Sequence, residues 1–172
     1  MWRTIKLIAR NGVRTEALPV PPAVSDKAVS GTGLQDEIRA ILGRALSIRA
    51  VDAGSCNACE LEIHALANPY YNIEGAGIRF VASPRHADLL LVTGPVSRNM
   101  AQALRRTYEA MPDPKLVVAA GQCACDGGIF GESYATLGRL QNVLPVDAMI
   151  PGCPPPPLEL LRGILAAVRR LR

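Results

Sequence analysis

Aromatic residues are scarce in this chain, although other apolar residues are abundant. Of its 172 residues, 49% are hydrophobic but only 4% are Phe, Trp or Tyr. A buried core therefore has to be built from Val, Leu, Ile and Ala, a mixture that suits buried parallel strands flanked by helices. The length fits one domain with an extension and is too short for two ordinary domains.

Long apolar runs are also lacking. No stretch approaches the roughly 18 uncharged apolar residues that cross a bilayer. The amino terminus has basic residues but no apolar stretch after them, no twin arginine and no small-residue cleavage site. The sequence thus predicts a protein that does not span a membrane, is not exported and stays in the cytoplasm.

Basic residues are in excess, but they follow no nucleic-acid-binding pattern. The formal net charge is +4 at pH 7, and arginines gather at both ends of the chain. Basic and aromatic residues do not interleave, and no helix-turn-helix or finger spacing is found, so nucleic acid is not expected as a partner. A solvated surface, or contact with acidic lipid headgroups or an acidic partner, would each fit this charge.

Residues 1–45 are expected to form an amino-terminal arm and an amphipathic helix, and residues 46–172 the main domain. The arm contains three prolines and no sustained periodicity up to residue 33, which indicates irregular structure. Apolar residues then recur at helical spacing from Leu34 to Ala45.

Within the main domain, short aliphatic runs alternate with helical patterns. Such alternation predicts an α/β fold with a doubly wound, mostly parallel sheet. The expected strands are Ile48–Val51, Ile78–Val81, Leu89–Val92, Leu116–Ala119 and Ala148–Ile150. The expected helices are Glu60–Ala67, Arg98–Ala110, Leu158–Leu171 and, with a weaker pattern, Tyr134–Leu140.

The cysteines follow the ends of three of these strands. Cys56 and Cys59 form a C-x-x-C pair after the first strand, while Cys123 and Cys153 follow two later strands. Because the loops at the carboxyl ends of parallel strands share one edge, these residues can converge. Four thiolates are the usual ligands of a [4Fe-4S] cluster. The sequence therefore predicts one such cluster, bound by Cys56, Cys59, Cys123 and Cys153.

Glycines stand close to these cysteines in the sequence. Backbone without side chains can turn tightly and bring its N–H groups against an anionic sulfur cage. The glycines concerned are Gly54, Gly121, Gly152 and the Gly127-Gly128 pair.

Other uses of the thiols stay open at this point. Structural zinc takes four thiolates too, although more often from two C-x-x-C knuckles. A thioredoxin-like dithiol would account for Cys56 and Cys59 alone, and inert buried cysteines would need no ligand.

Four segments carry a resemblance to a known family. From about Ile48 to Leu165 the chain resembles the small, cluster-bearing subunit of membrane-bound [NiFe]-hydrogenases of the formate hydrogenlyase and energy-converting type, homologous to the 20-kDa, cluster-N2 subunit of respiratory complex I. The C-x-x-C spacing resembles the hydrogenases, since complex I subunits place two adjacent cysteines there. The segments are Gly54–Ile63, Ser83–Asp88, Gly121–Cys123 with Gly127-Gly128, and Pro151–Pro155.

The resemblance implies a flavodoxin-like fold with helices on both faces and one proximal [4Fe-4S] cluster. It implies an electron-transfer subunit of an oxidoreductase complex, without a bond-making site of its own. The implied partners are a large subunit with a [NiFe] site, a ferredoxin-like iron–sulfur subunit and membrane subunits. The complex would lie on the cytoplasmic face of the inner membrane. The arm, which lies outside the resemblance, would either contact neighbouring subunits there or form a disordered tail. The alternatives are an N2-type subunit of a complex I-like NADH/quinone oxidoreductase and a zinc-stabilised binding module.

Five further residues are weighed on the same resemblance. The family pattern places the ligand two residues before Cys125, which leaves that thiol over. The counterpart of Glu62 sits near the cluster at the large-subunit interface, although a surface carboxylate is an equal alternative. His64 and His86 are not expected to be ligands. Arg85 could orient an interface loop or bind a carboxylate.

Overall fold

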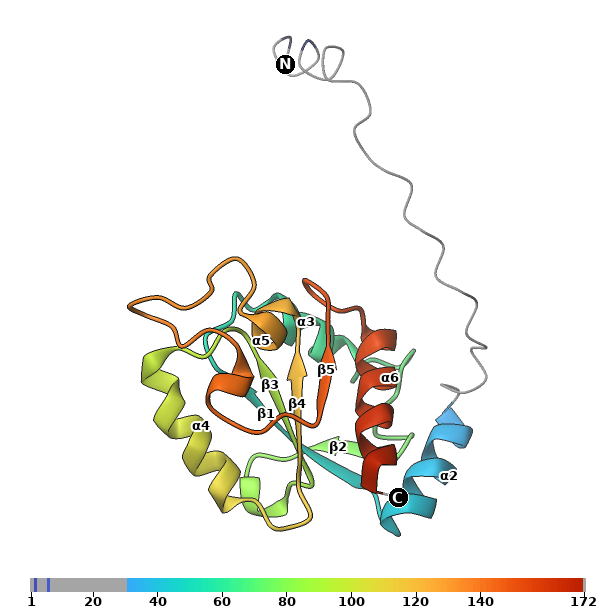
Figure 1. The fold of residues 1–172 in the computed structure, drawn as a ribbon. Helices are drawn as coiled ribbons and strands as arrows, with labels where there is room; N and C mark the ends of the chain where they lie inside the picture. Colours follow the sequence, from blue (N-terminus) through green and yellow to red (C-terminus); the bar gives the residue numbers. More distant parts are fainter. Residues whose placement is uncertain (1, 3–5, 7–30, 172) are drawn as a thin grey trace.

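A five-stranded sheet forms the centre of the molecule (Figure 1). The computed structural model describes residues 2, 6 and 31–171. All four pairings are parallel, and the spatial order is β2-β1-β3-β4-β5, which is the flavodoxin-like order. The predicted fold class is therefore confirmed. The strands are β1 (Leu46–Asp52), β2 (Ile78–Phe80), β3 (Leu89–Thr93), β4 (Leu116–Ala120) and β5 (Ala148–Ile150).

The register brings the carboxyl ends of four strands into line. Asp52 lies beside Thr93, Thr93 beside Ala120, and Ala120 beside Ile150. The central strands β3 and β4 are buried at every residue, which explains their continuous aliphatic sequence. The loops that follow β1, β4 and β5 consequently leave the sheet at one common edge.

Helices cover both faces of the sheet. Alternate strand residues face opposite sides, so Leu89 and Leu91 join one buried cluster while Leu90 and Val92 join the other. The first face is covered by α2 (Gly31–Leu42), α3 (Ala58–Ala65) and α6 (Pro157–Val168), and the second by α4 (Arg98–Ala110), α5 (Gln122–Asp126) and the 3-10 helix η3 (Leu140–Asn142). Two further 3-10 helices are η2 (Pro84–His86) and η4 (Arg169–Leu171).

One expected helix, Tyr134–Leu140, is wrong. This segment instead forms isolated antiparallel bridges, between Ser97 and Thr136 and between Glu132 and Leu137. The hydroxyl of Ser133 accepts hydrogen bonds from the N–H groups of Ala135 and Thr136, which favours a turn over a helix. The helix begins only at η3.

The amino-terminal arm expected up to residue 33 lies outside the described residues, apart from residues 2 and 6 and the first turn of α2. Leu34 and Ile38 of α2 pack into the buried cluster of the first face. Glu37 of the same helix pairs with Arg169 of η4 at 2.5 Å. Within the part of the chain that the structure describes, no helix is both long and apolar enough to cross a membrane.

Candidate metal centre

Four cysteines lie on the loops at the carboxyl edge of the sheet. After β1, Cys56 lies just before α3 and Cys59 lies in the first turn of that helix. Cys123 lies in α5, which follows β4. Cys153 lies in the loop between β5 and α6. Cys56 and Cys153 are exposed, whereas Cys59 and Cys123 are half-buried.

These thiols are close enough for their charges to interact. The pKa of Cys59 is raised to about 12, mainly by burial, then by Glu60 and then by Cys56, Cys123 and Cys153. The pKa of Cys123 is also raised, by burial first and next by Cys153 and Cys56. Four thiolates at one place repel one another, so a cationic centre between them would stabilise the charged form that binds metal.

Two glycines leave room for the sulfur atoms. A Cβ at Gly121 would lie 2.5 Å from the Sγ of Cys59, and a Cβ at Gly128 would lie 2.8 Å from the Sγ of Cys123. Their φ angles are +90° and +54°, which side-chain-bearing residues rarely adopt. Backbone therefore approaches two of the four thiols directly.

Two aspartates shape the cysteine loops, and the sequence reasoning missed both. Oδ1 of Asp52 accepts hydrogen bonds from the N–H groups of Gly54 and Ser55, each at 2.7 Å. Oδ1 of Asp126 accepts one from the N–H of Gly128 at 2.8 Å. The Asp-x-Gly pattern at both places is the sequence feature that could have found them, because Asp favours such turns.

Cys125 lies apart from the other thiols. It is buried in the cluster between α4, α5 and the sheet, and its Sγ donates a weak hydrogen bond to the carbonyl oxygen of Ala119 at 3.7 Å. Burial is the main cause that raises its pKa to about 11. Burial and a single weak hydrogen bond are the usual surroundings of a structural thiol.

The four thiols lie on three separate loops, and thiolates are the usual ligands of iron–sulfur clusters. Among residues 31–171, no three or more His, Cys, Asp or Glu side chains are grouped so that they could hold one metal ion. A four-iron cage is larger than one ion, so its thiolate ligands stand farther apart. Thiolates on three separate loops, with glycine backbone against two of them, match that requirement.

The other residues singled out from the sequence lie on α3 and η2. Glu62 is half-buried on α3, and His64 is exposed on the same helix. Arg85 and His86 are exposed on η2. Because η2 precedes β3, it lies toward the amino-terminal ends of the strands, whereas the cysteines follow the carboxyl-terminal ends. The structure does not bring Arg85 or His86 to the thiols.

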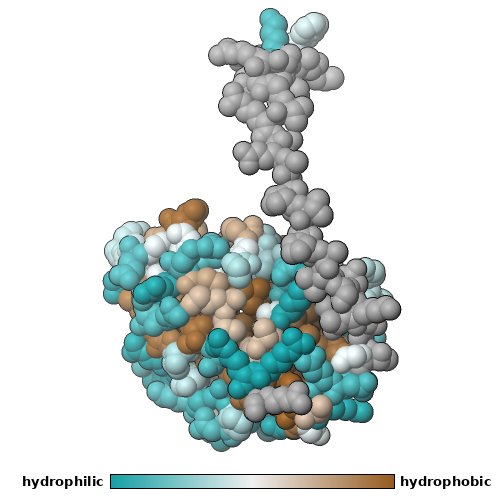
Figure 2. All heavy atoms as spheres, turned by 45° about the vertical axis from the view of Figure 1, so that its right-hand side comes forward, coloured by the Kyte–Doolittle hydropathy of each residue, from teal (hydrophilic) through white to brown (hydrophobic). Residues whose placement is uncertain are grey.

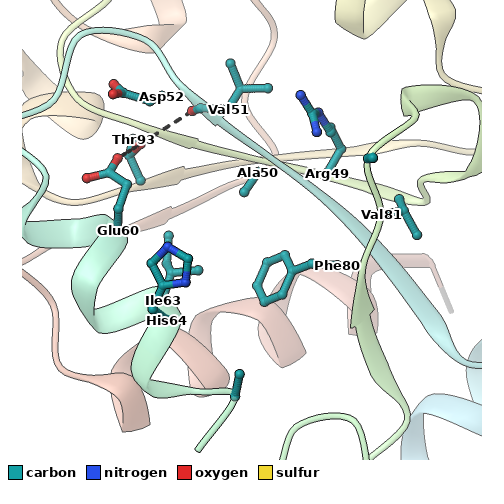
Figure 3. Close-up of a pocket in the computed structure, with 12 residues that line it drawn as sticks. Arg49, Ala50, Val51, Asp52, Glu60, Ile63, His64, Phe80, Val81 and Thr93 are labelled. Carbon is teal, nitrogen blue, oxygen red and sulfur yellow. Dashed lines mark hydrogen bonds between the residues drawn. The ribbon is translucent and has the colours of Figure 1, made fainter.

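A cavity of about 500 Å³ lies between α3, the end of β2 and the edge of β1 (Figure 3). Phe80 points from β2 toward Ile63 and His64 of α3. At the end near the cysteines, Oε1 of Glu60 accepts a hydrogen bond from the Thr93 hydroxyl, while its Oε2 is buried without a partner. The Glu60–Thr93 contact joins residues 33 positions apart, so no local pattern could predict it.

The fold and the site define a class: flavodoxin-like α/β proteins with a cysteine site at the carboxyl edge of the sheet. The chain belongs to the family described as NADH ubiquinone oxidoreductase, 20 Kd subunit, whose model matches residues 56–167. The resemblance found in the sequence is therefore confirmed.

Three relatives are subunits of named enzyme complexes. The chain is 45% identical to the probable membrane-bound hydrogenase subunit mbhJ of Pyrococcus furiosus, over 76% of this chain and 78% of that protein. It is 40% identical to formate hydrogenlyase subunit 7 of Escherichia coli, over 88% of this chain and 58% of that protein. It is 45% identical to a subunit of the NADH-quinone oxidoreductase of Desulfovibrio desulfuricans, over 72% of this chain and 66% of that protein. All three are subunits of oxidoreductase complexes.

Solved structures agree with this assignment. The fold matches a chain in the structure of the membrane-bound sulfane sulfur reductase, an archaeal respiratory membrane complex, with a TM-score of 0.66 and 31% identity. The match covers 83% of this chain and 76% of that chain. A chain of an NAD+-reducing [NiFe]-hydrogenase shares the fold alone, with a TM-score of 0.55, 19% identity, and 72% of this chain and 92% of that chain covered.

Proposed function

We propose that the chain binds one [4Fe-4S] cluster through Cys56, Cys59, Cys123 and Cys153. In this proposal it passes single electrons between a ferredoxin-like iron–sulfur subunit and the large subunit of a membrane-associated [NiFe]-hydrogenase complex. The observation that carries the proposal is the convergence of three strand-end loops, which places four thiols within reach of one another's charges.

The chain's own residues hold and protect the redox centre. A bound cluster supplies a site that gains and loses one electron at a time. Cys59 and Cys123 would be two of its ligands, and the backbone at Gly121 and Gly128 lies close to their sulfur atoms. Hydrogen bonds to Asp52 and Asp126 fix the loops that carry Cys56 and Cys123, so these residues would keep the thiols in place for a bound cluster.

The large subunit would cover the exposed side of the thiols. Several apolar side chains are exposed on α3 and on the loop after α5, including Leu61 at 61% and Ile129 and Tyr134 at 94% each. Figure 2 shows hydrophobic atoms at the upper rim of the main body, the edge that carries the strand-end loops in Figure 1. Exposed apolar surface of this kind marks interfaces. The names of the relatives and the net charge of +4 support a peripheral position on the cytoplasmic face of the membrane.

A second candidate is the N2-type subunit of a complex I-like NADH/quinone oxidoreductase. It is favoured by the 45% identity to a relative from an NADH-quinone oxidoreductase. The C-x-x-C spacing at Cys56 and Cys59 favours the hydrogenase instead. The third candidate, a zinc-stabilised module, is opposed by the absence of a single-ion site within residues 31–171.

The test is affinity purification of the complex from membranes under anaerobic conditions. Metal analysis, electron paramagnetic resonance and a hydrogen-uptake assay are then made on the same sample. A cluster signal together with nickel and hydrogen turnover supports the hydrogenase proposal. A partner without nickel that reduces quinone supports the second candidate, and a tightly bound zinc without a cluster signal overturns both.

A further inference from the structure

Strand β1 is longer than the edge strand β2 that pairs with it on one side. β2 pairs only with Leu46–Ile48, whereas β1 continues to Asp52. The N–H of Leu46 donates to the chain at Gly77, and the carbonyl of Ile48 accepts from the N–H of Val81. The next residue whose backbone faces this side is Ala50, because the orientation alternates along a strand.

Ala50 has no backbone partner on that side. Within the described chain, no hydrogen bond joins its N–H or carbonyl to the residues after Phe80. Instead, the cavity between α3 and the end of β2 occupies this place, with Ala50 in its wall (Figure 3). An open edge with an N–H and a carbonyl is a template for another strand.

Two residues that line the same cavity each have one buried polar atom without a partner. Nε of Arg49 is a buried donor and Oε2 of Glu60 is a buried acceptor, and neither has a hydrogen bond. Buried polar atoms in native proteins are nearly always paired. Arg49 points to the sheet face of Val51 and Glu60 lies on the other face (Figure 3). An occupant that pairs both atoms therefore complements the Ala50 backbone and offers an acceptor on one face of the sheet and a donor on the other.

An extended polypeptide meets these needs together. Its backbone alternates N–H and carbonyl groups that can pair with Ala50, and its groups on either side can reach Arg49 and Glu60. Its apolar side chains would pack against Phe80 and Ile63. A purely apolar small molecule would fill the space but leave the donor and the acceptors unpaired.

We propose that an extended segment of a partner subunit adds to the open edge of β1 at Ala50 and fills the cavity beside α3. The segment presents an acceptor, such as a carbonyl or carboxylate, to Arg49 and a donor to Glu60. Because Glu60 follows Cys59, this segment also shields the flank of the cysteine site. The proposal rests on the proposed function only in requiring a multi-subunit complex.

The first test is photocrosslinking in the assembled complex. Phe80 is replaced by the photoreactive residue benzoylphenylalanine, and the products are identified by mass spectrometry. Met149 on the opposite edge strand β5 is the control, since its exposure of 42% is close to the 37% of Phe80. We expect one partner peptide to be captured at Phe80 and not at Met149. Capture of lipid or quinone only, or of no peptide, overturns the proposal.

The second test perturbs the edge itself. Ala50→Pro removes the N–H that faces the cavity but none that pairs with β3, so β1 can tolerate the proline on its unpaired side. The matched variant Ala50→Ser keeps the N–H. Loss of one hydrogen bond should lower peptide capture at Phe80 about fivefold or more in Ala50→Pro, with capture unchanged in Ala50→Ser.

Iron content, measured on the same samples, separates this proposal from the proposed function. Unchanged iron with lowered capture supports strand addition, and equal capture in both variants overturns it. If the Ala50→Pro variant does not assemble into the complex, the proposal is decided by crosslinking at Phe80 in the complex without that substitution. A complex without a cluster that still shows the crosslink would refute the proposed function alone.

Discussion

Replacing Gly121 by Ala tests whether the close approach of backbone to Cys59 is needed for cluster binding. The new Cβ would lie 2.5 Å from the Sγ of Cys59, so the sulfur has to move by about 1 Å to reach an ordinary contact. The backbone cannot easily yield, because the N–H of Gly121 donates to Ile150 at 2.8 Å and its carbonyl accepts from Cys125 at 3.1 Å. We expect Gly121→Ala to lose most of its iron.

Gly43→Ala is the matched control. Gly43 also has a positive φ, of +67°, but a Cβ there meets nothing within 4 Å. Gly43→Ala should lose about 1–2 kcal/mol of unfolding free energy because of its positive φ. Gly121→Ala should lose at least as much, because φ 90° with ψ 153° is a conformation that is essentially restricted to glycine. Only Gly121→Ala should also lose iron and sulfide.

The assay combines urea unfolding with iron and sulfide analysis of anaerobically reconstituted protein. Reconstituted wild-type protein should contain about four irons and four sulfides per chain. Full iron in Gly121→Ala, or an equal loss of iron in Gly43→Ala, would show that the space beside Cys59 is not what the cluster requires.

Three further predictions concern single side chains. Cys123→Ser should abolish the cluster signal in electron paramagnetic resonance while Cys125→Ser, in the buried core, keeps it; the opposite pattern would mean that the wrong thiol was chosen. Asp52→Ala should lower reconstituted iron because the Cys56 loop loses two hydrogen bonds, whereas Asp52→Asn should retain most of it, and equal iron in both variants would contradict this role. Asp88→Ala should cost about 2–3 kcal/mol in urea unfolding, since this buried carboxylate accepts the N–H of Ser47 and pairs with Arg44. Asp113→Ala is the exposed control, and it should lower the free energy of unfolding by less than about 1 kcal/mol. If both variants lost a similar amount of unfolding free energy, burial of Asp88 would not be the cause.

The strands could be predicted because the central ones are buried on both sides. A strand such as β3 has to be apolar at every position, and its sequence Leu-Leu-Leu-Val-Thr shows this directly. The helix α5 was missed because its five residues are too few for a helical period to show. The error at Tyr134–Leu140 has two other causes. The hydrogen bonds to the Ser133 hydroxyl form a local turn that the apolar pattern does not reveal, and the bridge between Ser97 and Thr136 is a tertiary contact.

The cysteine site could be anticipated because it obeys a rule of topology. Once the strands are parallel, residues that follow their carboxyl ends meet at one edge, whatever their distance in sequence. The side chains around the cysteines obey no such rule. Glu60 meets Thr93 only because β1 and β3 are neighbours and α3 turns back over them. The open edge at Ala50 likewise depends on where β2 ends, which the aliphatic run up to Val81 does not reveal.

The unequal burial of the four thiols bears on the direction in which electrons would leave the chain. Cys59 and Cys123 are half-buried against glycine backbone, whereas Cys56 and Cys153 are exposed at the edge of the sheet. In the proposed function, a cluster held by all four is therefore enclosed by this chain on one side and bare on the other. Water on the bare side would stabilise its charged states and expose it to oxidation, so an apolar partner surface has to close it. The same partner surface would then offer the shortest route for the electron. The exposure of Cys56 and Cys153 therefore accounts both for their coverage by the large subunit and for electron transfer to it.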